Sequence, residues 1–99
     1  MTIEQLKRLL DDALTYDIYA DSLKDINDDI NLNKLTQQVM DLRVKINSIE
    51  NRHVRLCMTL RYVNGYSFNK IAKKMKVSYQ WINKLHNKGV EELLKIYNK

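Results

Sequence analysis

Proline is absent from the 99-residue chain, and glycine occurs only twice. These two residues most strongly interrupt a helix interior, so their scarcity predicts long helices. Cysteine occurs once, as Cys57, which excludes a disulfide within the chain and favours a reducing compartment. Because Cys57 lies in the apolar run LCMTL, we expect it to be a small buried hydrophobic residue.

No apolar run reaches the length of a membrane span, so the sequence predicts no transmembrane helix. The first residues, MTIEQLKRLLDD, are amphipathic and do not resemble a signal peptide. We therefore expect a protein of the cytoplasm. The sequence also has no glycine-rich phosphate loop, no carboxylate pair with a defined role and no nucleophile–base arrangement, so we expect no enzyme, cofactor or metal site.

The net charge of +5 is distributed unevenly along the chain. Residues 1–50 hold 6 Lys/Arg and 10 Asp/Glu, whereas residues 51–99 hold 11 Lys/Arg and 2 Asp/Glu. A basic half joined to an acidic half indicates one surface for a polyanion and another for a different partner. We therefore divide the chain into a helical or coiled-coil arm, 1–50, and a basic domain for the polyanion, 51–99.

Residues 66–90, YSFNKIAKKMKVSYQWINKLHNKGV, contain six lysines and no acidic residue. Ser67 and Ser78 each precede an apolar series with helical spacing, and a serine hydroxyl can cap a first helical turn. Only Lys76 and Val77 separate the two predicted helices. Two helices joined by so short a turn, the second polar on its outer face, are typical of a helix-turn-helix. The polyanion could be nucleic acid or an anionic membrane, and this motif favours nucleic acid.

The internal spacing of this segment also fits a helix-turn-helix. If Ala72 is the small residue at the helix crossing, the positions that such a motif keeps apolar are Ile71, Met75, Val77, Ile82 and Leu85. Lys76 departs from the pattern, because glycine usually occupies its place. Either Lys76 has φ > 0, at a cost of about 1–2 kcal/mol, or the turn has another shape. The simpler alternative is an ordinary pair of amphipathic helices in an all-α core.

The N-terminal half predicts two helices that precede this motif. Thr2 and Gln5 form a capping-box pattern, and a seam with steps of 3 and 4 follows: Leu6, Leu9, Ala13, Tyr16, Ala20 and Leu23. Asn and Asp residues at 25–33 predict the first break.

A second and more regular seam predicts one long helix over 33–63, bent near 48–51. Its members are Leu35, Val39, Leu42, Ile46, Ile49, His53, Leu56, Leu60 and Val63. We expect His53 to be a satisfied core residue rather than a metal ligand. The first helix could fold back on this seam as an antiparallel hairpin, or two chains could pair through it.

The second helix of the motif, from Ser78 to about Tyr97, is the predicted recognition helix. With its apolar residues inward, the side chains that face outward are Gln80, Asn83, Lys84 and Asn87, which suit base edges and phosphates. Tyr79 and Trp81 flank the buried face and could either touch DNA or pack, with packing across both helices favoured for Trp81. Phosphate contacts are predicted from basic side chains around the motif: Lys70, Lys73, Lys74, Lys76 and Lys88. Gly89, on the buried face, predicts a close helix approach.

Residues 61–94 resemble region four of bacterial sigma factors, and more closely the sigma-region-four-like RinA and ArpU type regulators of phages and mobile elements. Four pairs carry the resemblance: Arg61-Tyr62, Ile71-Ala72, Val77-Ser78 and Leu85-His86. It implies an all-α fold in which a helical arm precedes a helix-turn-helix that reads DNA through Tyr79, Gln80, Trp81, Asn83 and Lys84. Sigma factors have more Arg and Glu at these positions, so the operator sequence does not transfer. No segment resembles the region that reads the −10 promoter element, so we do not expect a complete sigma factor.

The resemblance implies a transcriptional regulator of a phage or mobile element that binds double-stranded DNA, with RNA polymerase and a second copy of the chain as further candidate partners. Two alternatives remain open. The chain could be a small-terminase-like DNA-recognition subunit of a phage packaging machine, which would form a ring. It could instead be an interaction module whose degenerate helix-turn-helix binds a host protein.

Overall fold

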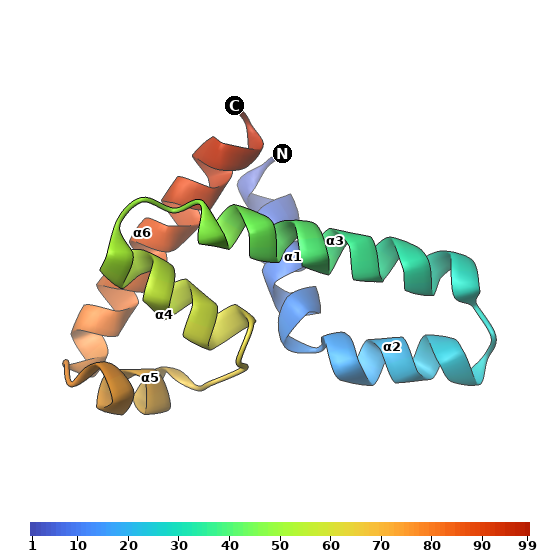
Figure 1. The fold of residues 1–99 in the computed structure, drawn as a ribbon, viewed down its shortest axis with the longest axis horizontal. Coiled ribbons are helices and arrows are strands. Elements are labelled where there is room, and N and C mark those ends of the chain that lie inside the picture. Colours follow the sequence, from blue (N-terminus) through green and yellow to red (C-terminus); the bar gives the residue numbers. More distant parts are fainter.

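The structure is a computed structural model that describes residues 1–99, and it contains six helices and no strand. The prediction of an all-α fold is confirmed. In chain order the helices are α1 (Ile3–Leu14), α2 (Tyr16–Asp25), α3 (Asp29–Asn47), α4 (Arg52–Tyr62), α5 (Phe68–Met75) and α6 (Tyr79–Tyr97) (Figure 1). None of these helices has the length and hydropathy to cross a membrane.

Polar side chains cap the helix starts at the positions that the sequence predicts. The Thr2 hydroxyl accepts from the backbone N–H of Gln5, and the Gln5 side chain accepts from the backbone N–H of Thr2. Ser67 and Ser78 accept from the third residue of α5 and α6 respectively. Each cap satisfies a backbone donor that has no partner inside its helix, which fixes where the helix begins.

The two long helices predicted for the N-terminal half are each divided. The first is interrupted at Thr15, whose hydroxyl donates to the carbonyl of Asp11. The second is fully broken at Ser48–Asn51, where the Ser48 hydroxyl donates to the carbonyl of Lys45 and Asn51 caps α4. These side chains offer the backbone partners outside a continuous helix, and the apolar spacing does not register this competition. The predicted break at 25–33 is shorter than expected, since α3 already begins at Asp29.

The turn at residues 48–51 changes which face of the following helix is buried. The seam positions before it are buried as predicted: Leu35, Val39, Leu42, Ile46 and Ile49. Beyond it the prediction is wrong, because His53, Leu56 and Val63 are exposed and Leu60 is half-buried. The buried residues of α4 are instead Val54, Cys57, Met58 and Tyr62. Since α4 starts afresh at its own cap, its rotation is independent of α3. Burial of Cys57 is confirmed.

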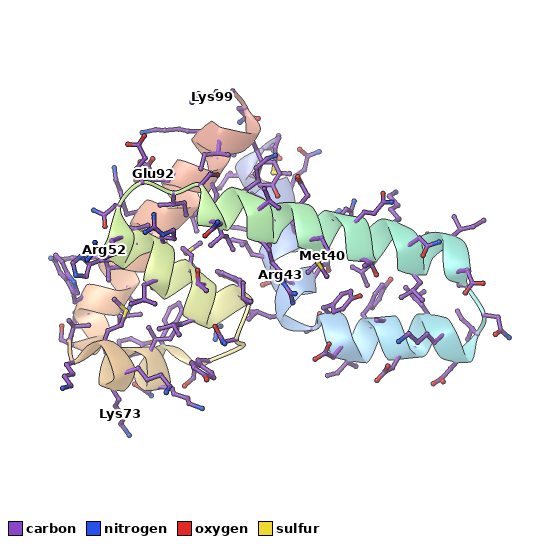
Figure 2. The ribbon with its side chains drawn as sticks, in the orientation of Figure 1. Met40, Arg43, Arg52, Lys73, Glu92 and Lys99 are labelled. Atoms are coloured by element: carbon purple, nitrogen blue, oxygen red, sulfur yellow. The ribbon has the colours of Figure 1, made fainter.

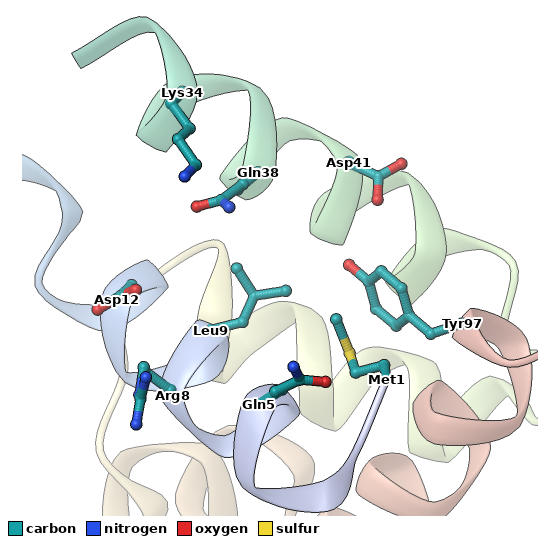
Figure 3. Close-up of a pocket in the computed structure, with 9 residues that line it drawn as sticks. All are labelled: Met1, Gln5, Arg8, Leu9, Asp12, Lys34, Gln38, Asp41 and Tyr97. Carbon is teal, nitrogen blue, oxygen red and sulfur yellow. The ribbon is translucent and has the colours of Figure 1, made fainter. Parts of the chain in front are cut away.

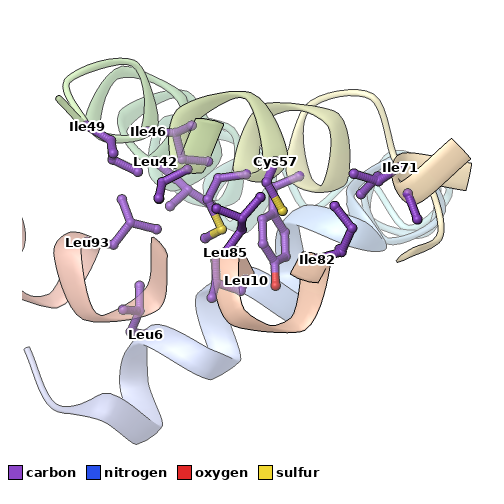
Figure 4. Packing of buried hydrophobic residues seen from close by; sticks show 14 residues of the cluster. Leu6, Leu10, Leu42, Ile46, Ile49, Cys57, Ile71, Ile82, Leu85 and Leu93 are labelled. Atoms are coloured by element: carbon purple, nitrogen blue, oxygen red, sulfur yellow. The ribbon is translucent and has the colours of Figure 1, made fainter. Parts of the chain in front are cut away.

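One main core joins both halves of the chain. Its 14 residues come from α1, the C-terminal part of α3, the turn that follows it, α4, α5 and α6, and include Leu6, Leu42, Cys57, Ile82 and Leu93 (Figure 4). The predicted domain boundary at residue 50 coincides with the α3–α4 turn, but this core extends across it.

A second, smaller core lies between α2 and the N-terminal part of α3, and consists of Leu23, Leu35 and Val39. The Tyr16 and Thr36 hydroxyls, 2.8 Å apart, also join these two helices. Together α2 and this part of α3 form a hairpin that projects from the main body (Figure 1). The long seam on α3 is thus covered by helices of the same chain.

Candidate nucleic-acid interface

The turn between α5 and α6 is closed by a lysine in the left-handed conformation. Lys76 has φ 58° and ψ 45°, so the first of the two predicted turn shapes is the observed one. The backbone N–H of Val77 donates to the carbonyl of Ala72 at 3.0 Å. This geometry costs about 1–2 kcal/mol in a residue with a Cβ atom. It places the Lys76 side chain in solvent at the corner of the motif.

The inner side of the two helices is apolar at the predicted positions. Ile71, Ala72, Ile82 and Leu85 are buried, while Met75 and Val77 are half-buried against the main core. Gly89 is also buried, and a Cβ atom there would overlap the Met58 side chain. The predicted close approach of two helices is therefore the approach of α6 to α4. The side of α6 that faces away from the core carries the exposed residues Gln80 and Lys84.

Four of the five residues that the resemblance assigns to DNA reading are exposed: Tyr79, Gln80, Trp81 and Lys84. Asn83 is half-buried and is turned partly away from solvent. The Tyr79 ring lies 6.0 Å from the Phe68 ring, so Tyr79 both packs and remains 45% exposed. Trp81 is 47% exposed, which does not support the expected bracing of the two helices by its ring.

The lysines on and beside α5 are all exposed: Lys70, Lys73, Lys74 and Lys76. Lys73 points away from the body of the protein (Figure 2). The Nζ atoms of Lys70 and Lys74 lie 4.0 and 5.3 Å from the centre of the Tyr66 ring. Attraction between a cation and an aromatic face restrains both side chains on the same side of α5. This role of Tyr66 was not predicted from the sequence. Its spacing of four and eight residues from the two lysines is the pattern that could have indicated it.

Two predicted site residues have competing surroundings. Lys88 lies 3.4 Å from the Glu92 carboxylate and 3.7 Å from that of Glu91, so its charge is partly compensated within α6.

Asn87 is exposed but lines a hollow of about 420 Å³ between α1 and α6. Lys7 of α1 lines the same hollow. Asp11 of α1 lines it too, so the fold places one basic and one acidic side chain of α1 next to α6, which no local sequence pattern could reveal.

A cluster of four side chains connects α4, α5 and α6 behind the exposed surface. The Tyr62 hydroxyl lies 2.5 Å from Nε2 of His86, and the His86 ring lies 5.0 Å from the Phe68 ring. The Arg61 guanidinium lies 4.8 Å from the Phe68 ring centre and donates to the carbonyl of Tyr66 at 3.1 Å. Burial, and secondly the charge of Arg61, lowers the pKa of His86, while burial raises the pKa of Tyr62 to about 12. Both groups are thus neutral near pH 7, and the cluster serves to orient α6.

The charge around the motif has one sign over a long stretch of chain. Residues 51–90, from the α4 cap to the middle of α6, include nine Lys/Arg and no Asp/Glu. No group of three or more His, Cys, Asp or Glu side chains is placed to hold a metal ion. The available chemistry at this surface is therefore the binding of anions by lysine, together with hydrogen bonds from Gln80 and its neighbours.

The largest hollow lies elsewhere, between α1, α3 and the C-terminal end of α6 (Figure 3). It has a volume of about 690 Å³ and is lined by charges of both signs, Arg8 and Lys34 against Asp12 and Asp41. The Tyr97 hydroxyl is buried without a hydrogen-bond partner, and burial, followed by the negative charge of Asp41, raises its pKa to about 12. Tyr97 ends α6 whereas Tyr79 begins it, so this hollow is separate from the lysine-rich surface.

Comparison with known proteins gives no family. The chain matches no protein-family model, no curated protein and no solved structure.

Proposed function

We propose that this protein binds double-stranded DNA in a sequence-specific manner, with the first half of α6 in the major groove. The observation that carries the proposal is the exposure of Gln80 and Lys84 on a helix whose opposite face is fixed in the core by Ile82 and Leu85. A helix held in this way can enter a groove without losing its packing. The absence of acidic residues from 51–90 removes the repulsion that phosphates would otherwise meet.

Each exposed side chain has a role in this proposal. Gln80 bonds an adenine edge, and Lys84 bonds guanine or a phosphate. Lys70, Lys73 and Lys74 on α5 contact phosphates and set the position of the motif on the duplex. Asn83 and Asn87 lie at the margins of the contact, since the first is half-buried and the second faces α1.

We further propose that DNA binding serves transcription regulation in a phage or mobile element, with RNA polymerase as a candidate partner. The resemblance of residues 61–94 to region four of sigma factors supports this part. The acidic arm supports a second interaction, because its charge suits a partner other than nucleic acid.

The test is fluorescence anisotropy with duplexes selected from a random pool, measured over a range of salt. If about five lysines contact phosphates, log affinity should fall with log salt at a slope of roughly −4 to −5. The matched control is Lys24→Ala, an exposed lysine on α2, which should leave the slope unchanged. Absence of binding to every duplex at low salt would reject DNA binding and favour a host-protein interaction module.

A further inference from the structure

The outer face of α3 carries a second seam, opposite the one that the core covers. Six residues follow one another at steps of 3, 4, 3, 4 and 3, and we name them the outer seam: Ile30, Asn33, Gln37, Met40, Val44 and Asn47. All six are exposed and none is charged. Ile30 is 83% exposed, Val44 65% and Met40 47%. Apolar residues therefore lie on both faces of this helix.

A helix face that contacts only water usually carries charged residues, and the outer seam carries none. Charged residues make up 29% of this chain, yet the outer seam has none over the five turns of α3. Its alternation of 3 and 4 is the spacing that keeps a stripe of side chains against a second helix. Isolated apolar residues on a surface need no explanation. Met40 and Val44 lie one turn apart, and with Ile30 and three amide side chains they form an uncharged stripe that suits a small contact surface.

We propose that the outer seam binds a second copy of this chain, with the two α3 helices antiparallel around a two-fold axis. Such an interface is self-complementary, so one seam supplies both sides of the contact. The proposal goes beyond DNA binding and does not depend on it. It also differs from pairing through the predicted long seam, since that seam is covered by α1, α2 and α6 of the same chain.

Charge complementarity selects the second copy and the antiparallel direction. The hairpin tip at the start of α3 carries Asp25, Asp28 and Asp29. The other end carries Arg43 and Lys45, and because Lys45 pairs with Asp41 at 3.2 Å, half-buried Arg43 is the cation left without an acidic partner there. Parallel helices would bring the two acidic tips together. Antiparallel helices bring the acidic tip of one copy beside the basic end of the other, twice by symmetry. Arg43 lies three residues beyond Met40 on the same helix (Figure 2).

One register of the antiparallel pair matches side chains by type. In this register the two-fold axis is level with Leu35, whose own side chain faces the smaller core. Ile30 then lies opposite Met40 of the second copy, and Asn33 lies opposite Gln37. Apolar side chains then meet apolar ones, and the two amides can satisfy each other across the contact. In the same register Asp29 lies near Arg43 of the second copy. In this register residues 29–41 of the two α3 helices overlap over about 20 Å, and Val44 and Asn47 lie beyond the paired part. The interface is therefore small and the dimer should be reversible.

Sedimentation equilibrium of the full chain, up to millimolar concentration, tests the pairing. We expect a monomer–dimer equilibrium, and Met40→Glu should weaken it at least about tenfold by placing a carboxylate against Ile30. Ile18→Glu is the matched control, because Ile18 is 74% exposed on α2 and lies outside the outer seam. Circular dichroism checks that each variant keeps its helices. A wild-type chain that stays monomeric, or equal effects of the two substitutions, would overturn the proposal and leave the seam to another protein.

Cross-linking tests the direction. Ile30→Cys and Met40→Cys chains, mixed and oxidised, should form a disulfide only between the two different variants, while buried Cys57 stays unreacted. Rapid cross-linking of Ile30→Cys with itself would reject the antiparallel arrangement. Because neither assay contains DNA, a chain that dimerises without binding any duplex would reject the proposed function alone.

Discussion

The Tyr62 hydroxyl on α4 lies 2.5 Å from Nε2 of His86 on α6, and this contact joins the recognition helix to the helix before the motif. Burial raises the pKa of Tyr62 to about 12 and lowers the pKa of His86 below its ordinary value of 6.5. Either atom can donate in this hydrogen bond, according to the tautomer of the imidazole. Protonation of His86 places a charge in a partly buried site near Arg61, so the folded state is sensitive to acid.

We expect the protein to lose stability as the pH falls below the ordinary pKa of the His86 imidazole. The unfolded chain binds a proton there more readily than the folded chain does. The stabilisation is therefore complete above pH 6.5 and decreases as the pH falls toward the lower pKa of the folded state. Urea denaturation across this range measures the effect, and His86→Gln should flatten it. His53 is exposed, so His53→Gln should retain the wild-type profile. Equal profiles for the two variants would contradict this role of His86.

Substitutions on α5 and α6 should affect DNA binding in two different ways. Gln80→Ala or Lys84→Ala should change which duplexes are preferred and cost about 1–3 kcal/mol on the best site. Lys73→Ala or Lys74→Ala should weaken all duplexes alike and reduce the salt slope by about 1 for each lysine removed. Anisotropy titrations against matched and altered duplexes separate the two effects. The division of roles fails if both kinds of variant act equally on every sequence.

Lys76→Gly should stabilise the fold because it relieves the left-handed backbone at the turn. We expect a gain of about 1 kcal/mol in the free energy of unfolding, less than the full strain because glycine also loosens the unfolded chain. Asn27 has φ 56° and is a residue that tolerates this conformation, so Asn27→Gly should gain less. Urea denaturation compares the two variants. A destabilised Lys76→Gly variant would show that the lysine side chain contributes more than its backbone costs.

Gly89→Ala should destabilise the protein even though alanine favours helices. The new Cβ would overlap the side chain of Met58, which is fully buried and would have to shift within the core. Overpacking of this kind costs about 1–3 kcal/mol, against a gain of about 1 kcal/mol in helix propensity. Denaturant midpoints measure the net loss. In a Met58→Ala background the same substitution should become neutral or favourable, and a loss of equal size there would refute the steric explanation.

The sequence predicts α5 and α6 in detail because the signals of these two helices are local. Serine caps at Ser67 and Ser78, together with helical apolar spacing, determine where α5 and α6 begin and which sides are buried. The turn at residues 48–51 escapes the same reasoning. A seam that continues in phase through His53 predicts one helix with a bend near 48–51, and only the capping of α4 by Asn51 shows that the bend is a full break.

In the candidate interface, a helical wheel predicts which side chains of α5 and α6 are exposed. It cannot predict contacts between segments that lie far apart in the sequence. Gln80, Lys84 and the α5 lysines are exposed as expected. The place of Lys7 beside Asn87 depends on how α1 packs, which no local pattern contains.

The shared core makes residues 51–99 unsuitable for transfer to another protein. Five of the 14 side chains of the main core come from residues before 51: Leu6 and Leu10 of α1, Leu42 and Ile46 of α3, and Ile49 of the turn that follows. A fragment starting at residue 51 would expose the apolar side chains that pack beneath α6. We expect such a fragment to aggregate rather than to bind a duplex through α6. The N-terminal half therefore completes the core beneath α6, and a segment that is moved to another protein must include α1.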